Sequence, residues 1–333
     1  MLQAYSLRLM LFLFLIPNEI TTRHTLNGLM TVLALAGWVL VIVSLGTVAI
    51  EGYALGTRLS VLDMNENSLG VLALLTMVGV LWQAVQPSSR HKRLKVLASC
   101  AFLLGAIALA AASGSRGSAI SLVITLLAFC LWQPTRRWGV MGIAVLALGA
   151  VLAPLLFSTT LERFAVTPGD TVLGGREALW QATMRLILDH LWGGVGIGNA
   201  PYAVLPYVRL LRSVLGQERA VAHSPVLTIC AETGLVGIFL YLGVLGTALW
   251  SFAQPLLRHR KSDTRIPSPY MALVASVFLG YMPSWIKGGG MESDYSYFLM
   301  LALLLIPSTI DRNALRKDME TANRSRQSPE KVG

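Results

Sequence analysis

The sequence predicts an all-α polytopic membrane protein with about nine transmembrane helices and one large, largely helical external loop. Of its 333 residues, 54% are hydrophobic and only 13% are charged, and the mean hydropathy is +0.62. A soluble chain carries about 25% charged residues. The apolar residues also fall in long runs, many of them near the ~20 residues that a helix needs to cross a bilayer. An ordinary soluble enzyme is therefore excluded.

Eight apolar runs are predicted to span the membrane, and a ninth stretch is ambiguous. The ambiguous stretch, residues 2–16, is short, contains Arg8 and is followed by the helix breaker Pro17. It is a ninth span, a signal-like segment or the remnant of a longer helix, and the lack of a small-x-small cleavage site argues against its removal. The eight runs cover residues 28–50, 68–85, 96–112, 118–132, 138–158, 235–252, 269–286 and 295–310.

The distribution of Lys and Arg among the loops predicts the orientation, because cytoplasmic loops retain positive charge during insertion. With the loops near residues 90–95, 136–137 and 258–265 inside, the cytoplasmic segments hold 17 basic and six acidic residues. The opposite face holds nine basic and eleven acidic residues, and Arg8 in the first apolar stretch completes the total. The formal charge of +10 therefore follows from topology and does not indicate nucleic-acid binding.

This orientation divides the chain into four parts. Residues 1–158 are predicted to be N-terminal transmembrane helices, 159–234 an external loop domain, 235–310 C-terminal transmembrane helices and 311–333 a disordered cytoplasmic tail. The external segment far exceeds the ~12–15 residues of an ordinary loop. It is rich in Leu, Val and Trp, so we expect it to fold as a cap.

Within this cap, residues 176–192 are predicted to form an amphipathic helix. Its apolar residues recur every three or four positions, at Trp180, Met184, Ile187 and Leu191. Arg176 stands at the start of this helix, where free backbone N–H groups and the helix dipole favour an anion. An arginine adds a planar fork suited to phosphate oxygens, although a solvated surface arginine is the alternative.

The helix is followed by a glycine-rich stretch, residues 193–198. Its spacing is not G-x-G-x-x-G and no strand precedes it, so nucleotide binding is disfavoured. The glycines instead predict a tight turn and a close approach of the backbone to a neighbouring helix or to substrate.

Two further residues are candidates for chemistry. Arg116 lies between small residues at the outer junction of two apolar helices, where it either reaches lipid headgroups or binds an anion. His223 precedes the last external approach to the membrane, and histidine is the side chain that acts as a base near neutral pH without a large pKa shift. The sequence predicts no metal site and no cofactor, and Cys100, Cys130 and Cys230 are expected to be packing residues.

Three blocks of sequence together resemble the O-antigen ligase and polymerase superfamily of bacterial envelope glycosyltransferases. They are Ser115-Arg116-Gly117, the segment 175–198 and the segment 223–237, in this order around the large external loop. Arg58 with Asn67 in the first external loop is a weaker match. The resemblance extends roughly from Arg58 to Trp250.

The resemblance implies a membrane glycosyltransferase of the bacterial inner membrane with its active face on the periplasmic side. Such an enzyme moves a glycan from an undecaprenyl-diphosphate carrier to a sugar hydroxyl, on a glycan or a lipid-A-core-type acceptor, without metal or nucleotide. It implies that Arg116 and Arg176 bind the diphosphate and that His223 is the catalytic base, with inversion at the anomeric carbon. Arg58 and Glu232 are implied in supporting roles.

The chain departs from the family pattern at Ser224, where many relatives have asparagine after the histidine. Relatives also commonly have more spans with both ends inside, as if N-terminal helices were absent here. Two alternatives stay open: an O-antigen or exopolysaccharide polymerase of the same superfamily, which shares the donor and differs in the acceptor, and a polysaccharide or lipid transporter whose cap only binds.

Overall fold

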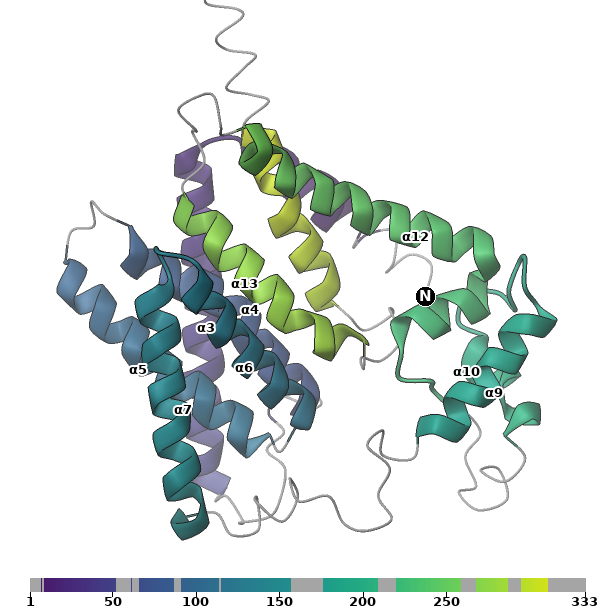
Figure 1. The fold of residues 1–333 in the computed structure, drawn as a ribbon, viewed down its shortest axis with the longest axis horizontal. Helices are drawn as coiled ribbons and strands as arrows, with labels where there is room; N and C mark the ends of the chain where they lie inside the picture. The colour runs from purple at the N-terminus through teal and green to yellow at the C-terminus, as the bar shows by residue number, and fades with distance from the viewer. Residues whose placement is uncertain are drawn as a thin grey trace, which may run out of the picture.

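A computed structural model describes residues 7, 9–51, 61, 66–86, 91–113, 115–156, 176–208, 220–258, 268–286 and 295–310. Helices dominate these segments, and long apolar helices form a bundle beside a smaller helical cap (Figure 1). The prediction of an all-α polytopic membrane protein is therefore confirmed. The helices are η1 (Leu9–Leu15), α2 (Ile16–Glu19), α3 (Arg23–Glu51), α4 (Glu66–Val85), α5 (Lys92–Ala112), α6 (Arg116–Leu131), α7 (Arg136–Leu156), α9 (Arg176–Asp189), α10 (Ala200–Ala203), η2 (Leu205–Tyr207), α12 (Pro225–Arg258), α13 (Ser268–Ile286) and a last helix, Tyr295–Ile310.

Five of the described helices are long and apolar enough to cross a membrane. Three shorter apolar helices accompany them, Met10–Glu19, Gly117–Leu131 and Tyr295–Ile310. The chain is thus a multi-pass membrane protein, and the total of nine spans stays a prediction. The five long segments are Arg23–Ile50, Ser68–Val85, Lys92–Ala110, Pro225–Pro255 and Pro269–Ile286.

The sequence suggested that the first apolar helix ends before Pro17, but the structure shows that the helical conformation continues through Pro17 to Glu19. The π-helix η1 continues into α2, and Pro17 lies in the first turn of α2. A proline is tolerated there because the N–H groups of a first turn have no partner within the helix. The next helix, α3, starts after a reciprocal cap, in which the Thr25 N–H donates to the Thr22 hydroxyl at 3.2 Å and the Thr22 N–H to the Thr25 hydroxyl at 3.1 Å.

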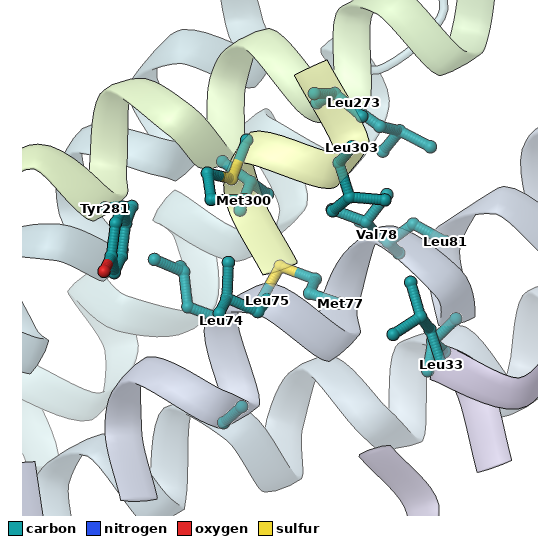
Figure 2. Packing of buried hydrophobic residues seen from close by; sticks show 14 of the residues in the cluster. Leu33, Leu74, Leu75, Met77, Val78, Leu81, Leu273, Tyr281, Met300 and Leu303 are labelled. Carbon is teal, nitrogen blue, oxygen red and sulfur yellow. The ribbon is translucent and has the colours of Figure 1, made fainter. Parts of the chain in front are cut away.

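The helix α4 lies at the centre of the bundle and packs against α3, α5, α6 and α13. Figure 2 shows its residues Leu74, Leu75, Met77, Val78 and Leu81 beside side chains of α13 and the last helix. Small residues bring the helices close: a Cβ on Gly79 would lie 2.6 Å from Ala34 N in α3. Close contact at small residues is the usual basis of helix association inside a membrane.

Three helix ends meet at one face of the bundle. A Cβ on Gly70, near the start of α4, would overlap Ser118 of α6. The Ser121 and Ser284 hydroxyls, from α6 and the end of α13, lie 2.7 Å apart. The start of α6, which carries Arg116, is therefore packed between α4 and α13, at the face that the loop charges predict to be external.

Candidate functional site

Arg116 is the first residue of α6, and its position is set by buried serines. The Ser118 N–H donates to the Ser115 hydroxyl at 3.2 Å, which caps the helix. The Ser115 N–H in turn donates to the Ser113 hydroxyl at 3.3 Å. Both capping serines are buried, so the backbone at Arg116 is held by the end of α5 on one side and by α6 itself on the other.

The cap has a small core of its own. On α9, Ala182, Leu186 and Ile187 are buried. They pack with apolar residues of α10, of the segment near residue 220 and of α12. The described part of the segment that the sequence predicts to be external is therefore a folded unit attached to the N-terminal end of α12.

The amphipathic helix is confirmed, but the predicted apolar face is partly wrong. Ile187 is buried and Trp180 and Leu191 are partly buried, whereas the side chain of Met184 is 47% exposed. The buried face includes Ala182 and Thr183. A pattern of large apolar residues does not reveal a buried face made partly of small side chains.

The glycine-rich stretch packs directly on α12, at a break in that helix. Gly234 has φ 64° and ψ −164°, which interrupts the helix. Backbone groups of α12 on both sides of Gly234 form hydrogen bonds with the cap. The Leu235 N–H donates to the Leu191 carbonyl at 2.8 Å, and the Ala231 carbonyl accepts from the Val195 N–H at 2.9 Å. The predicted close approach of this backbone to a neighbouring helix is confirmed.

Two glycines make this contact possible. Gly194 has φ 64°, and a Cβ there would overlap the backbone of Glu232. A Cβ on Gly234 would overlap the Trp192 carbonyl. Other residues rarely adopt a positive φ, so both positions require glycine for conformation as well as for space.

His223 lies at the start of α12, exposed and with φ 48°. The next residue, Ser224, is buried, and its carbonyl accepts a hydrogen bond from the Thr228 N–H at 2.9 Å. Pro225 opens the helix, where its missing N–H has no cost. The imidazole thus stands beside a helix N-terminus, where the dipole favours negative charge.

A hydrogen bond joins α9 to the residue before His223. The Trp180 indole N–H donates to the Ala222 carbonyl at 2.7 Å, one residue before His223. Arg176, the first residue of α9, lies one helical turn before Trp180. The second turn of α9 is therefore held against the loop that leads into α12. A helix N-terminus favours an anion, and the His223 imidazole can accept a proton.

The other predicted site residues, Glu232, Arg116 and Arg58, are not part of the contact between α9 and the loop before α12. Glu232 is buried on α12 at the break, where its backbone carbonyl accepts from the Gly196 N–H at 2.9 Å. Arg116 belongs to α6, which packs against α13, α7 and α4, whereas α9 packs against α12. Arg58 lies outside the described residues. The structure thus joins α9, through Trp180, to the residue before His223 and places Arg116 in the bundle.

A comparison with known families assigns this part of the chain. Residues 98–242 match the sequence model of a family described as O-antigen ligase. The match covers this segment and less than half of the chain, and it supports a place in the O-antigen ligase superfamily. No curated protein matches the chain. The O-antigen ligase segment runs from within α5 to the membrane part of α12 and includes Arg116, Arg176, His223 and Glu232, so the resemblance is confirmed where its motifs lie.

An aromatic stack, which the sequence did not reveal, joins the O-antigen ligase segment to the helices after it. Tyr241 of α12 stacks on Trp285 of α13, with ring centroids 6.1 Å apart, and on Tyr297 of the last helix at 5.1 Å. The Trp285 indole donates to the Tyr241 hydroxyl at 3.0 Å. Aromatic residues near the ends of the predicted spans were the available signal, but such residues also mark membrane interfaces.

Proposed function

We propose that this protein transfers a glycan from an undecaprenyl-diphosphate carrier to a sugar hydroxyl on the periplasmic side of the bacterial inner membrane. The match of residues 98–242 to the O-antigen ligase family supports a ligase or polymerase-type membrane glycosyltransferase. The donor, the acceptor class (a glycan or a lipid-A-core-type saccharide) and the residue roles are the proposal. His223 is the general base, and Arg116 and Arg176 bind the diphosphate.

The hydrogen bond between Trp180 and Ala222 is the observation that carries this proposal. It holds the helix that opens with Arg176 against the residue that precedes His223. A diphosphate bound at the N-terminus of α9 or of α12 meets a favourable backbone dipole. The acceptor hydroxyl then approaches from the exposed side of His223.

The chemical step balances with these groups alone. The acceptor oxygen forms a bond to the anomeric carbon while its proton passes to the His223 imidazole. The bond between the anomeric carbon and the diphosphate oxygen breaks, and the lipid diphosphate leaves with the electron pair. Guanidinium groups stabilise the charge that develops on the leaving group, and attack opposite to it inverts the anomeric centre.

The proposed donor site takes residues from both the bundle and the cap. Arg116 opens a helix of the bundle, whereas Arg176 and His223 belong to the cap and the start of α12. We propose that Arg116 meets the diphosphate from the bundle side, where the carrier lipid is anchored. Donor binding then requires both parts of the molecule.

Transfer by the purified protein in lipid vesicles tests the base assignment. With lipid-linked donor and saccharide acceptor supplied on the outer side, His223→Ala should lower the rate by about 100-fold or more, because general base catalysis contributes about 10²–10⁴. Most of the supplied lipid-linked donor should remain unconsumed. Normal transfer by this variant would remove His223 from the mechanism.

The arginine assignments need a matched control on the same helix. Arg176→Ala should raise the donor concentration needed for half-maximal rate, and Arg176→Lys should restore only part of the affinity, because lysine lacks the planar fork. Arg185→Ala, at an exposed position of α9, should leave donor affinity unchanged. A transporter would form no glycosidic bond in the same assay, and chains of repeating units among the products would identify a polymerase.

A further inference from the structure

One face of the cap exposes large apolar side chains that its core does not use. Met184, Leu188 and Trp192, spaced four residues apart, are 47%, 65% and 72% exposed. Residues at this spacing lie on one side of a helix. Trp192 lies after the end of α9, but the backbone there still turns as in a helix, since the Gly194 N–H donates to the His190 carbonyl at 2.9 Å. We call these three residues the cap strip. Exposed apolar groups that adjoin one another mark an interaction surface.

The cap strip ends where α12 changes from cap-covered to uncovered. Before the break at Gly234, Ala231 and Glu232 of α12 are buried. Beyond it, Val236, Phe239 and Leu240 are exposed on a helix that is long and apolar enough to span the membrane. Large apolar side chains exposed on such a helix face lipid. The lipid boundary of α12 therefore lies near its break.

The break also fixes the position of the cap strip. The Leu191 carbonyl accepts the Leu235 N–H at 2.8 Å, and the Trp192 carbonyl lies against Gly234. The backbone at the end of the cap strip is thus at the level where the lipid-facing part of α12 begins. Tryptophan is the residue enriched at the membrane–water interface.

The composition of α9 changes along this same side. In the first two turns the side carries Glu177 and Gln181, both exposed, and in the last two it carries Met184 and Leu188. The face becomes apolar toward the break in α12. This gradient is the one expected for a helix whose C-terminal end enters an interface while its start stays in water.

We propose that the cap strip rests on the outer leaflet of the bilayer, with Trp192 and Leu188 in the interfacial layer. The partner is a lipid surface, continuous with the lipid around α12. The cap then has two attachments to the membrane, the covalent one through α12 and this one. The second attachment fixes the height of the cap above the lipid, and it stands independently of the proposed glycan transfer.

Fluorescent labels on the full chain in vesicles test this contact. The native Cys100, Cys130 and Cys230 are replaced by alanine, and a polarity-sensitive probe is attached through Leu188→Cys or, as a second site, Trp192→Cys. Gln181→Cys, at an exposed position on the same side of α9, is the matched control. Lipids carrying a spin label just below the headgroup are then added as quenchers.

The expected result is a blue-shifted emission and strong quenching at positions 188 and 192, with little of either at 181. Equal, water-like emission at all three positions would show that the cap strip stands in water, which overturns the proposal. A blue shift at 188 and 192 without quenching by spin-labelled lipid would show that protein covers the cap strip, such as a second copy of the chain. That outcome overturns the proposal as well.

Discussion

At the level of single residues, the contact between Trp180 and Ala222 positions His223. The loop before α12 has a left-handed backbone at His223, a conformation that costs energy for a non-glycine residue. The indole N–H at 2.7 Å from the Ala222 carbonyl and the buried Ser224 hold this loop in place. The sequence pattern placed Trp180 on an apolar helix face and did not predict that its indole N–H donates a hydrogen bond.

Replacing Trp180 by phenylalanine tests this positioning role. The ring stays, but the Ala222 carbonyl loses its donor, at a cost of about 0.5–1.5 kcal/mol for a neutral hydrogen bond. We expect the rate of transfer at saturating donor to fall about tenfold, while donor affinity changes little. Trp250→Phe, at an exposed position of α12, should leave the rate unchanged, and an equal loss in both variants would contradict the role.

A second residue-level contact makes the cap sensitive to high pH. The Tyr207 hydroxyl donates to the Asp189 carboxylate at 2.5 Å. This hydrogen bond, with smaller contributions from desolvation and the carboxylate charge, raises the pKa of Tyr207 above its usual 10.0. The folded state therefore favours the protonated phenol. The stabilisation is complete below the unfolded pKa and is lost as the pH rises through the folded value.

Thermal unfolding as a function of pH checks this linkage. Between neutral pH and pH 9 the difference in unfolding temperature between the native chain and Tyr207→Phe should be constant. Above pH 10 the difference should shrink as the native phenol ionises. A difference that stays constant throughout would show that the phenol does not contribute through its proton.

At the level of elements, the break in α12 is the feature that joins the cap to the membrane part. The sequence predicted a span from residue 235, whereas the helix starts at Pro225 and is interrupted at Gly234. The freed N–H of Leu235 bonds to the Leu191 carbonyl, and the freed carbonyls of Ala231 and Glu232 accept from the glycine-rich stretch. Buried backbone groups need partners, so the stretch and the break depend on each other.

Two adjacent glycines give a matched test of this junction. Gly194→Ala places a methyl group against the Glu232 backbone at a positive φ, whereas a Cβ on Gly193 meets nothing within 4 Å. The left-handed conformation alone costs about 1–2 kcal/mol with a side chain, so Gly194→Ala should lower the unfolding temperature clearly. Gly193→Ala should have little effect, and equal effects of the two changes would contradict the described contact.

At the level of the whole molecule, the aromatic stack of Tyr241, Trp285 and Tyr297 couples α12 to the rest of the bundle. All three rings are buried, although much of the apolar surface of α12 is exposed. The stack also links the O-antigen ligase segment to helices outside the family match. Stacked aromatic pairs add about 0.5–1.5 kcal/mol beyond the area they bury.

Graded changes at Trp285 test this coupling. Trp285→Phe keeps a ring in the stack and loses the hydrogen bond to Tyr241, so we expect a loss of about 1 kcal/mol. Trp285→Ala also removes the ring and should cost about 3–5 kcal/mol. Reversible unfolding in detergent measures both, and Trp250→Ala on the exposed side of α12 is the control. Equal stability of the three variants would show that the stack does not hold α12.

The sequence by itself determined the membrane class, the approximate positions of the described apolar helices and the similarity of the central segment to the O-antigen ligase family. These follow from hydropathy, residue spacing and local motifs, each of which depends on residues near one another in the chain. Only the tertiary structure decided which face of α9 is buried, that α12 breaks at Gly234 and that Trp180 supports the loop at His223. Each of these depends on contacts between residues distant in sequence, where small side chains and backbone hydrogen bonds select one arrangement among several that the pattern allows.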